Sequence, residues 1–225
     1  MPLIHSRNEA IELINSKKIL IFDFDGVILD SVHIKTEAFG DLYIDFGEDI
    51  ADLVKKYHEE NGGMSRFEKI KYYNDVLLAD QHINESCDSM AEKFSELVFD
   101  KVVIANEIPG VMDFIKHYKK KSIPMAINSA TPTEELIQIL ISRDLKRYFS
   151  QIMGSPTSKY ENLVSILEAN QADRKDAIFF GDAESDLLAA DKIGMDFIGI
   201  GEFIKEKDVV FSSKQFNAIN FIELI

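Results

Sequence analysis

The chain has 225 residues, 46% of them hydrophobic, which is enough for one substantial core or for a core with a smaller appended unit. It carries 39 acidic residues against 25 lysines and arginines, a formal net charge of −14, so its long-range field would repel nucleic acid and anionic membranes. The same charge repels a phosphorylated substrate, so a phosphate site here requires locally concentrated cations, backbone N–H groups or a metal ion.

A single cysteine, Cys87, limits the chemistry available to the chain. It excludes an intrachain disulfide and a Cys-rich zinc site and fits a reducing compartment, so we expect a cytoplasmic protein. Nowhere do about 18 consecutive apolar residues occur, and residues 1–14 include charged positions, so we expect neither a membrane span nor a signal peptide. The partner class that remains is a small molecule.

The predicted elements begin with a short helix, because Ser6 and Glu9 have capping-box spacing ahead of an apolar pattern. Four apolar runs of strand length follow, at residues 19–24, 123–127, 177–180 and 197–200. They lack polar alternation and end at Asp, Asn or Gly, as parallel strands buried on both faces do. Helix starts lie between the later runs, at Pro109 and at the capping-box spacings 131–134 and 158–161. This alternation predicts an α/β fold, a doubly wound Rossmann-like parallel sheet.

The interval from residue 31 to about 107 has only the 3.6-residue periodicity of helices, broken by Asn61, Gly62 and Gly63. It predicts an all-helical unit inserted after the first strand. The expected organisation is therefore an α/β core of residues 1–30 and 108–225, with a helical insert at 31–107.

The first predicted strand runs directly into two acids, Asp23 and Asp25, followed by Gly26. Ligands of open α/β sheets collect beyond the carboxyl ends of the strands, so both acids lie where a site is expected. Taken alone, the pair fits a ligand site and a pair of solvated loop aspartates equally well.

Other predicted strand ends and helix starts contribute further polar residues: Ser129 and Ala130 after the second run, Lys159 at a helix start, and Asp182 and Asp186 after Gly181. Independent loops rarely supply such a set in this order. With these four motifs, residues 18–200 resemble the haloacid dehalogenase superfamily, whose first motif is similar to Asp-Phe-Asp-Gly-Val at positions 23–27. Ser129, Lys159 and the segment 181–186 resemble its second, third and fourth motifs.

The resemblance implies a phosphatase that forms an aspartyl-phosphate, with Asp23 as nucleophile and Asp25 as general acid and base. It also implies Mg²⁺, because adjacent carboxylates and a phosphate dianion coexist only around a hard cation. Asp23 and Asp182 would supply side-chain oxygens and Asp25 its backbone carbonyl, with Asp186 close by, holding a metal-bound water or Lys159. An acid at position 25 favours phosphate esters, because the related dehalogenases and phosphonatases lack it.

Phosphate contacts are expected from Ser129, from backbone N–H groups at Ala130 and Gly26, and from Lys159. A serine before a helix is usually only a cap, but Thr131 fits that role better and leaves Ser129 free. Lys159 at a helix start could equally be a solvated side chain, although a cation is unfavourable there.

The helical insert corresponds in position to the C1 cap of this superfamily, which closes over the site and selects the leaving group. Arg66, in the sequence Gly-Gly-Met-Ser-Arg, could reach an anionic or hydroxyl-rich leaving group. Ser65 and Glu68 also fit a plain capping box. The spacing of His33, His58, His82 and His117 suggests no metal site, and we expect surface or helix-face positions for them.

Two alternatives remain open. A phosphosugar mutase of the β-phosphoglucomutase type has a similar cap loop, but such mutases usually carry a histidine where this chain has Lys35, and lack the second acid that Asp186 provides. A non-catalytic phospho-accepting or binding protein uses a similar acidic Mg²⁺ pocket. Receiver domains of that kind lack a large insert after the first strand.

Overall fold

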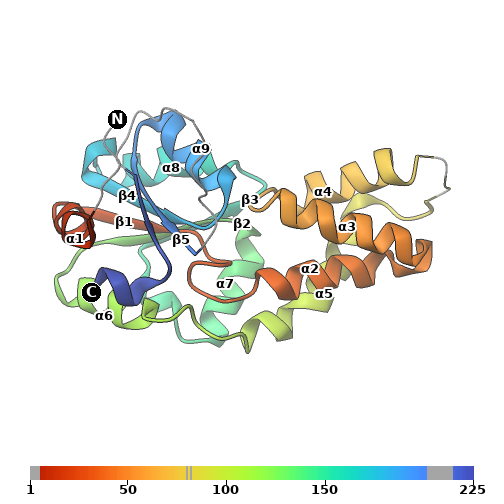
Figure 1. Ribbon diagram of the computed structural model, residues 1–225, viewed down its shortest axis with the longest axis horizontal. Coiled ribbons are helices and arrows are strands. Elements are labelled where there is room, and N and C mark those ends of the chain that lie inside the picture. Colours follow the sequence, from red (N-terminus) through yellow and green to blue (C-terminus); the bar gives the residue numbers. More distant parts are fainter. Residues whose placement is uncertain (1–5, 80, 82, 202–214) are drawn as a thin grey trace.

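The computed structural model describes residues 6–79, 81, 83–201 and 215–225, and its centre is a six-stranded parallel sheet (Figure 1). The strand order is β3-β2-β1-β4-β5-β6. The strands are β1 (Ile19–Phe22), β2 (Met125–Pro132), β3 (Gln151–Ser155), β4 (Ala177–Gly181), β5 (Asp196–Ile200) and β6 (Gln215–Ala218). The predicted doubly wound, Rossmann-like α/β fold is confirmed.

Strand β1 lies at the centre of the sheet, and all four of its residues are buried. Phe22 is in register with Ile127 of β2 and Phe180 of β4. Side chains of a strand alternate between faces, so Ile19 and Ile21 enter one hydrophobic cluster while Leu20 and Phe22 enter the other. An apolar run with no polar alternation is what a strand covered on both faces requires.

Helices cover both faces of the sheet. The face of Ile21 packs against α8 (Lys159–Ala169) and α9 (Glu184–Ile193), whereas the face of Phe22 packs against α1 (Arg7–Asn15), α6 (Val111–Lys120) and α7 (Thr133–Ser142). Short helices complete the chain: 3₁₀ turns at Ile44–Phe46, Lys146–Tyr148, Arg174–Asp176 and Phe221–Leu224, and a π-helix at Tyr73–Leu77. Among the described residues, no helix is long and apolar enough to cross a membrane.

Helices α2 (Val32–Tyr43), α3 (Glu48–Glu60), α4 (Arg66–Tyr72) and α5 (Cys87–Val103) form a separate bundle, which we call the helical insert. It extends from the edge of the sheet at which β1 and β2 end (Figure 1). Its interior is aromatic, with Phe39 stacked on Phe94 at 3.9 Å between ring centroids and Tyr43 against Tyr73. The two connections to the core run side by side, because the amide of Asp30 donates to the carbonyl of Asn106.

The helix starts follow the capping signals at Ser6, Ser65 and Ser158, each of which accepts a backbone N–H three residues later. The predicted cap at Thr131 is wrong. Helix α7 begins at Thr133 with Pro132 at its N-cap, while Thr131 still belongs to β2. The hydroxyl of Thr131 instead contacts Asp25 and Lys35 and does not cap a helix.

Candidate active site

Asp23 follows the last residue of β1 and is only 3% exposed. One carboxylate oxygen accepts the backbone N–H of Phe24 at 2.6 Å, and the other accepts the Lys159 ammonium at 2.7 Å. Both oxygens are therefore held in one orientation at the carboxyl end of the central strand, where parallel sheets bind their ligands.

Lys159 is the first residue of α8, and its side chain is buried between two carboxylates. Its ammonium donates to Asp186 at 2.5 Å as well as to Asp23. Burial by itself would lower the pKa of Lys159, but Asp186 and Asp23 raise it well above its usual value. The two carboxylates therefore favour the charged form of Lys159 beside Asp23.

Asp23, Asp182 and Asp186 each have a carboxylate oxygen within 4.8 Å of the others. Burial, followed by repulsion from Asp23 and Asp186, raises the pKa of Asp182 well above its ordinary value. Burial and Asp23 likewise raise the pKa of Asp186 to about 7. Three crowded carboxylates, of which Asp182 and Asp186 have raised pKa values, fit a hard divalent cation, which prefers oxygen ligands and would relieve their repulsion.

Gly26 is needed for this crowding. Its φ is +74°, and a Cβ atom at this position would lie 2.1 Å from a carboxylate oxygen of Asp182. Any other residue would displace Asp182, so the glycine lets the loop after β1 approach the loop after β4.

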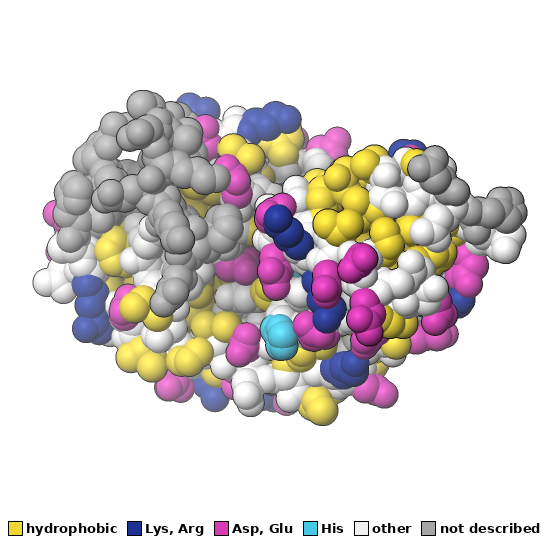
Figure 2. Space-filling model, turned by 45° about the vertical axis from the view of Figure 1, so that its right-hand side comes forward, with side chains coloured by type: hydrophobic (Ala, Val, Ile, Leu, Met, Phe, Trp, Pro, Cys, Tyr) yellow, Lys and Arg dark blue, Asp and Glu magenta, His cyan; other side chains and the backbone are white. Residues whose placement is uncertain are grey.

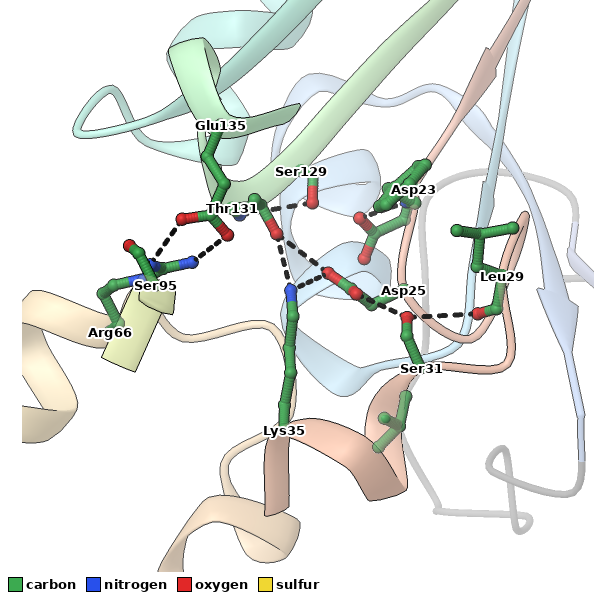
Figure 3. Close-up of polar contacts among 12 residues, drawn as sticks. Asp23, Asp25, Leu29, Ser31, Lys35, Arg66, Ser95, Ser129, Thr131 and Glu135 are labelled. Atoms are coloured by element: carbon green, nitrogen blue, oxygen red, sulfur yellow. Dashed lines mark hydrogen bonds and ion pairs between the residues drawn. The ribbon is translucent and has the colours of Figure 1, made fainter. Parts of the chain in front are cut away.

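The carboxylate of Asp25 points toward Ser31 and Lys35 at the start of the helical insert and toward Thr131 (Figure 3). One carboxylate oxygen accepts Ser31 at 2.6 Å, while the other accepts Thr131 at 2.9 Å and the ammonium of Lys35. Burial would raise the pKa of Asp25, but the charge and hydrogen bonds of Lys35, together with the hydroxyls of Ser31 and Thr131, hold it below its ordinary value. The two aspartates of the first motif thus lie in different electrostatic environments.

Ser129 and Ala130 come from the bulged end of β2 and face the same space as Asp23. Ser129 is 1% exposed, and the amide of Thr131 donates to its hydroxyl at 3.3 Å. The hydroxyl hydrogen of Ser129 therefore stays available for a phosphoryl oxygen.

A pocket of about 80 Å³ lies between the end of the sheet and the helical insert. The core side of its lining comprises Asp23, Asp25, Ser129, Ala130, Thr131 and Asp182, and the insert contributes Lys35, His58, Arg66, Lys69, Phe39 and Phe94 among others. Gly26, Lys159 and Asp186 are not part of the lining, although Gly26 lies against Asp182 and Lys159 pairs with Asp23, which both line it. The structure thus brings all the predicted site residues into one region.

Acidic side chains gather on the outer surface where the insert meets the core (Figure 2). The field outside the pocket therefore opposes an incoming phosphate, as expected from the composition. The opposing positive charges are buried inside: Lys35, Arg66, Lys69 and Lys159 are all less than 9% exposed.

Arg66 lines the pocket, but its guanidinium already has an anionic partner. Two nitrogens donate to the two carboxylate oxygens of Glu135 on α7 at 2.7 Å each, and one of them also contacts Ser95 (Figure 3). Arg66 thus links the insert to the core. The contact of Arg66 with a leaving group stays a prediction. It would require the guanidinium to bind Glu135 and the leaving group at the same time.

The sequence patterns do not predict the pocket positions of Lys35, His58, Lys69 and Thr131. His58 lies on a helix face as expected, but it is buried, at 8% exposed, and is not a surface residue. His82 falls outside the described residues. A signal for Lys69 does exist in the sequence. Arg66, Lys69, Ile70 and Tyr73 share one helix face by their spacing, so two basic residues occupy an otherwise apolar stripe.

Comparison with known proteins gives consistent matches. Residues 20–200 match the family model described as haloacid dehalogenase-like hydrolase. The chain is 26% identical over 183 residues to Phosphoglycolate phosphatase 1 of Pseudomonas aeruginosa, covering 79% of this chain and 67% of that protein. It is 25% identical over 189 residues to the Phosphorylated carbohydrates phosphatase of Thermotoga maritima, covering 80% and 82%.

The crystal structure of β-phosphoglucomutase from Clostridium difficile superposes with a TM-score of 0.67 at 20% identity, covering 83% of this chain and 86% of that one. At this identity the likeness concerns the fold alone.

Proposed function

Because the chain belongs to the haloacid dehalogenase-like hydrolase family, we propose that it is a Mg²⁺-dependent phosphatase that hydrolyses a small phosphomonoester through a phosphorylated Asp23. The observation that carries the proposal is the cluster of Asp23, Asp182 and Asp186 at the carboxyl end of the sheet, in which Lys159 pairs with the buried Asp23 and Asp186. The names of the relatives support phosphoglycolate and phosphorylated carbohydrates as candidate substrates.

In the first step a carboxylate oxygen of Asp23 attacks phosphorus. The Asp23–phosphorus bond forms, the bond to the leaving oxygen breaks, and Asp25 gives a proton to that oxygen. In the second step water attacks the phosphorus, Asp25 takes the proton from water, and the Asp23–phosphorus bond breaks to release inorganic phosphate. Asp25 is thus restored to its protonated form for the next substrate.

The environment of Asp25 suits the second step directly, because Lys35, Ser31 and Thr131 favour the ionised carboxylate that must accept a proton. For the first step the carboxyl must be protonated, and the phosphate dianion of the arriving substrate raises its proton affinity. The carboxylate of Asp25 faces the helical insert. The leaving oxygen of a substrate whose leaving group lies on that side would therefore be next to Asp25.

The phosphoryl group itself is held by the hydroxyl of Ser129, by the backbone N–H groups at Ala130 and Gly26, and by the charge of Lys159. Asp23 and Asp182 would bind Mg²⁺ through carboxylate oxygens and Asp25 through its backbone carbonyl, with Asp186 beside them. Bound there, Mg²⁺ would offset the negative charge of carboxylates and phosphate alike. The helical insert acts as a cap, and residues 31–107 remain our proposal for its extent.

A phosphosugar mutase is the second candidate, supported by the fold likeness to β-phosphoglucomutase. Lys35 and Asp186 are the two departures from the mutase pattern. The test is release of inorganic phosphate from a panel of small phosphomonoesters with Mg²⁺, including β-glucose 1-phosphate with separate detection of glucose 6-phosphate. Isomer formation without phosphate release would overturn the phosphatase proposal, and phosphate release from any of them would exclude a non-catalytic protein.

A further inference from the structure

The pocket contains one cation whose charge no acidic side chain balances among the described residues. Lys35 pairs with Asp25, Arg66 with Glu135, and Lys159 with Asp23 and Asp186. The ammonium of Lys69 instead has polar contacts only with His58, at 2.9 Å to Nδ1 and 3.4 Å to the backbone oxygen.

Lys69 is one of the most deeply buried lysines of the described chain, at 1% exposed. Burial, then repulsion by Lys35 and Lys159, lowers its pKa to about 7. Burial and the charge of Lys69 lower the pKa of His58 to about 3, so His58 is neutral and its Nδ1 lone pair accepts the ammonium. His58 therefore orients Lys69 without neutralising it.

A buried ammonium without a counter-charge is strongly unfavourable, unless a ligand provides that charge. Lys69 lines the pocket from the insert side, opposite Asp23 and Ser129 on the core side. A phosphoryl group held beside Asp23 therefore leaves the rest of the substrate facing Lys69.

The surroundings of Lys69 indicate what the ligand is. The ring centroid of Phe39 lies 5.9 Å from the Lys69 ammonium, and Phe39 stacks on Phe94. Every acidic side chain among the described lining residues comes from the core side. Apolar walls exclude water and strengthen an ion pair. A polyol leaving group would find few hydrogen-bond acceptors there, and a pocket of about 80 Å³ favours a short chain over one with a second phosphate.

We propose that Lys69 is a specificity-determining residue that binds a carboxylate on the leaving group, with His58 as the residue that positions its ammonium. This inference rests on the proposed phosphatase function and names the class of substrate: a short phosphomonoester whose alcohol carries a carboxylate.

The test compares 2-phosphoglycolate with the corresponding amide, 2-phosphoglycolamide, which has nearly the same shape without the charge. The wild-type protein should prefer the carboxylate by about 100-fold in kcat/KM, the range of a hydrogen bond to a charged group. In Lys69→Met the preference should fall below about threefold, since methionine keeps the length of the side chain but donates nothing.

Lys71→Met is the matched control, because Lys71 lies two residues away on the same helix with its side chain 72% exposed and paired to Asp75. It should retain the full preference. His58→Leu should raise the KM for the carboxylate more than the KM for the amide, with little change in kcat, which a purely structural loss would not do. An equal preference in Lys69→Met and wild type, or no preference in wild type, would overturn the inference.

Calorimetric titration in Ca²⁺, in which we expect little turnover, separates this inference from the proposed function. The carboxylate should bind wild type more tightly than the amide, and Lys69→Met should bind both alike. If no compound releases phosphate with Mg²⁺ but this difference in affinity persists, hydrolysis fails and the carboxylate site stands. If both compounds bind wild type equally, or neither binds, the carboxylate site fails.

Discussion

Arg66 of α4 and Glu135 of α7 form a buried ion pair through two hydrogen bonds of 2.7 Å (Figure 3). The side chains are 4% and 9% exposed, and the guanidinium also lies 4.8 Å from the centroid of the Phe94 ring. Burial would raise the pKa of Glu135, but Arg66 holds it below its ordinary value. Arg66, which the sequence predicts as a contact to the leaving group, thus joins the helical insert to the core.

We therefore expect Arg66→Ala to lower kcat/KM on an aryl phosphate and on a carboxylate-bearing substrate to a similar extent. Loss of one partner from a buried pair leaves the other charge uncompensated and costs about 3–5 kcal/mol, so closure of the insert suffers whatever the substrate. Denaturant unfolding and steady-state kinetics measure the two effects.

The double variant Arg66→Met/Glu135→Leu provides the control, because it removes both charges. It should lose less stability than the sum of the two single variants. A loss confined to the carboxylate-bearing substrate would instead return Arg66 to the role of a leaving-group contact.

The core of the site could be predicted because a parallel sheet brings the carboxyl ends of its strands to one edge. Asp23, Ser129 and Asp182 follow apolar runs, so their meeting follows from the fold class alone. Strand β3 carries Gln151, Gly154 and Ser155 and has no apolar run to reveal it.

The contacts made by the helical insert could not be predicted from local patterns. Lys35 and Lys69 belong to helices whose orientation over the sheet depends on tertiary packing, and a lysine in a helix is usually solvated. Thr131 shows the same limit in a motif, because capping-box spacing does not indicate whether a hydroxyl has a better partner across the site.

Replacement of Mg²⁺ by Ca²⁺ should lower turnover by roughly an order of magnitude or more, because Ca²⁺ takes more ligands at longer distances. The larger ion would draw Asp23 into its coordination and away from attack on phosphorus. To check this, the protein is first stripped of metal with a chelator, and phosphate release is then measured with Mg²⁺ or with Ca²⁺ added. Equal rates would contradict the ligand arrangement proposed for Asp23 and Asp182.

Lys69→Met should be more stable than wild type by about 2–4 kcal/mol at about pH 6, where the buried lysine is charged. Lys69 releases its proton near pH 7 when folded but near pH 10.5 when unfolded, so between these values the unfolded chain binds more protons. Wild-type stability therefore rises with pH in this window.

The advantage of Lys69→Met should accordingly be full below pH 7 and shrink as the pH rises to about 9. Urea unfolding of wild type and Lys69→Met at about pH 6 and about pH 9 measures the difference, with Lys71→Met as the control. A constant difference across the window would mean that Lys69 has an anionic partner in the free protein.

The two aspartates of the first motif should respond differently to the same substitution. Asp23→Asn should abolish turnover, because an amide is a poor nucleophile and a ligand for the metal is lost at the same time. Asp25→Asn keeps the backbone carbonyl, and an activated leaving group needs little protonation, so Asp23 should still be phosphorylated. Hydrolysis of that adduct should slow by about 10²–10⁴-fold, because no carboxylate receives the proton from water.

Mass spectrometry of Asp25→Asn after mixing with an activated phosphomonoester and Mg²⁺ should then find one phosphoryl group on Asp23. Ser31→Ala gives a milder perturbation of the same carboxylate, because it removes the 2.6 Å hydrogen bond to Asp25 and keeps Lys35. It should slow turnover without accumulating the adduct to the same level. We assign Asp23 as the nucleophile because Lys159 and the Phe24 amide hold its carboxylate in place. A phosphoryl group on another residue, or normal turnover by Asp23→Asn, would contradict that assignment.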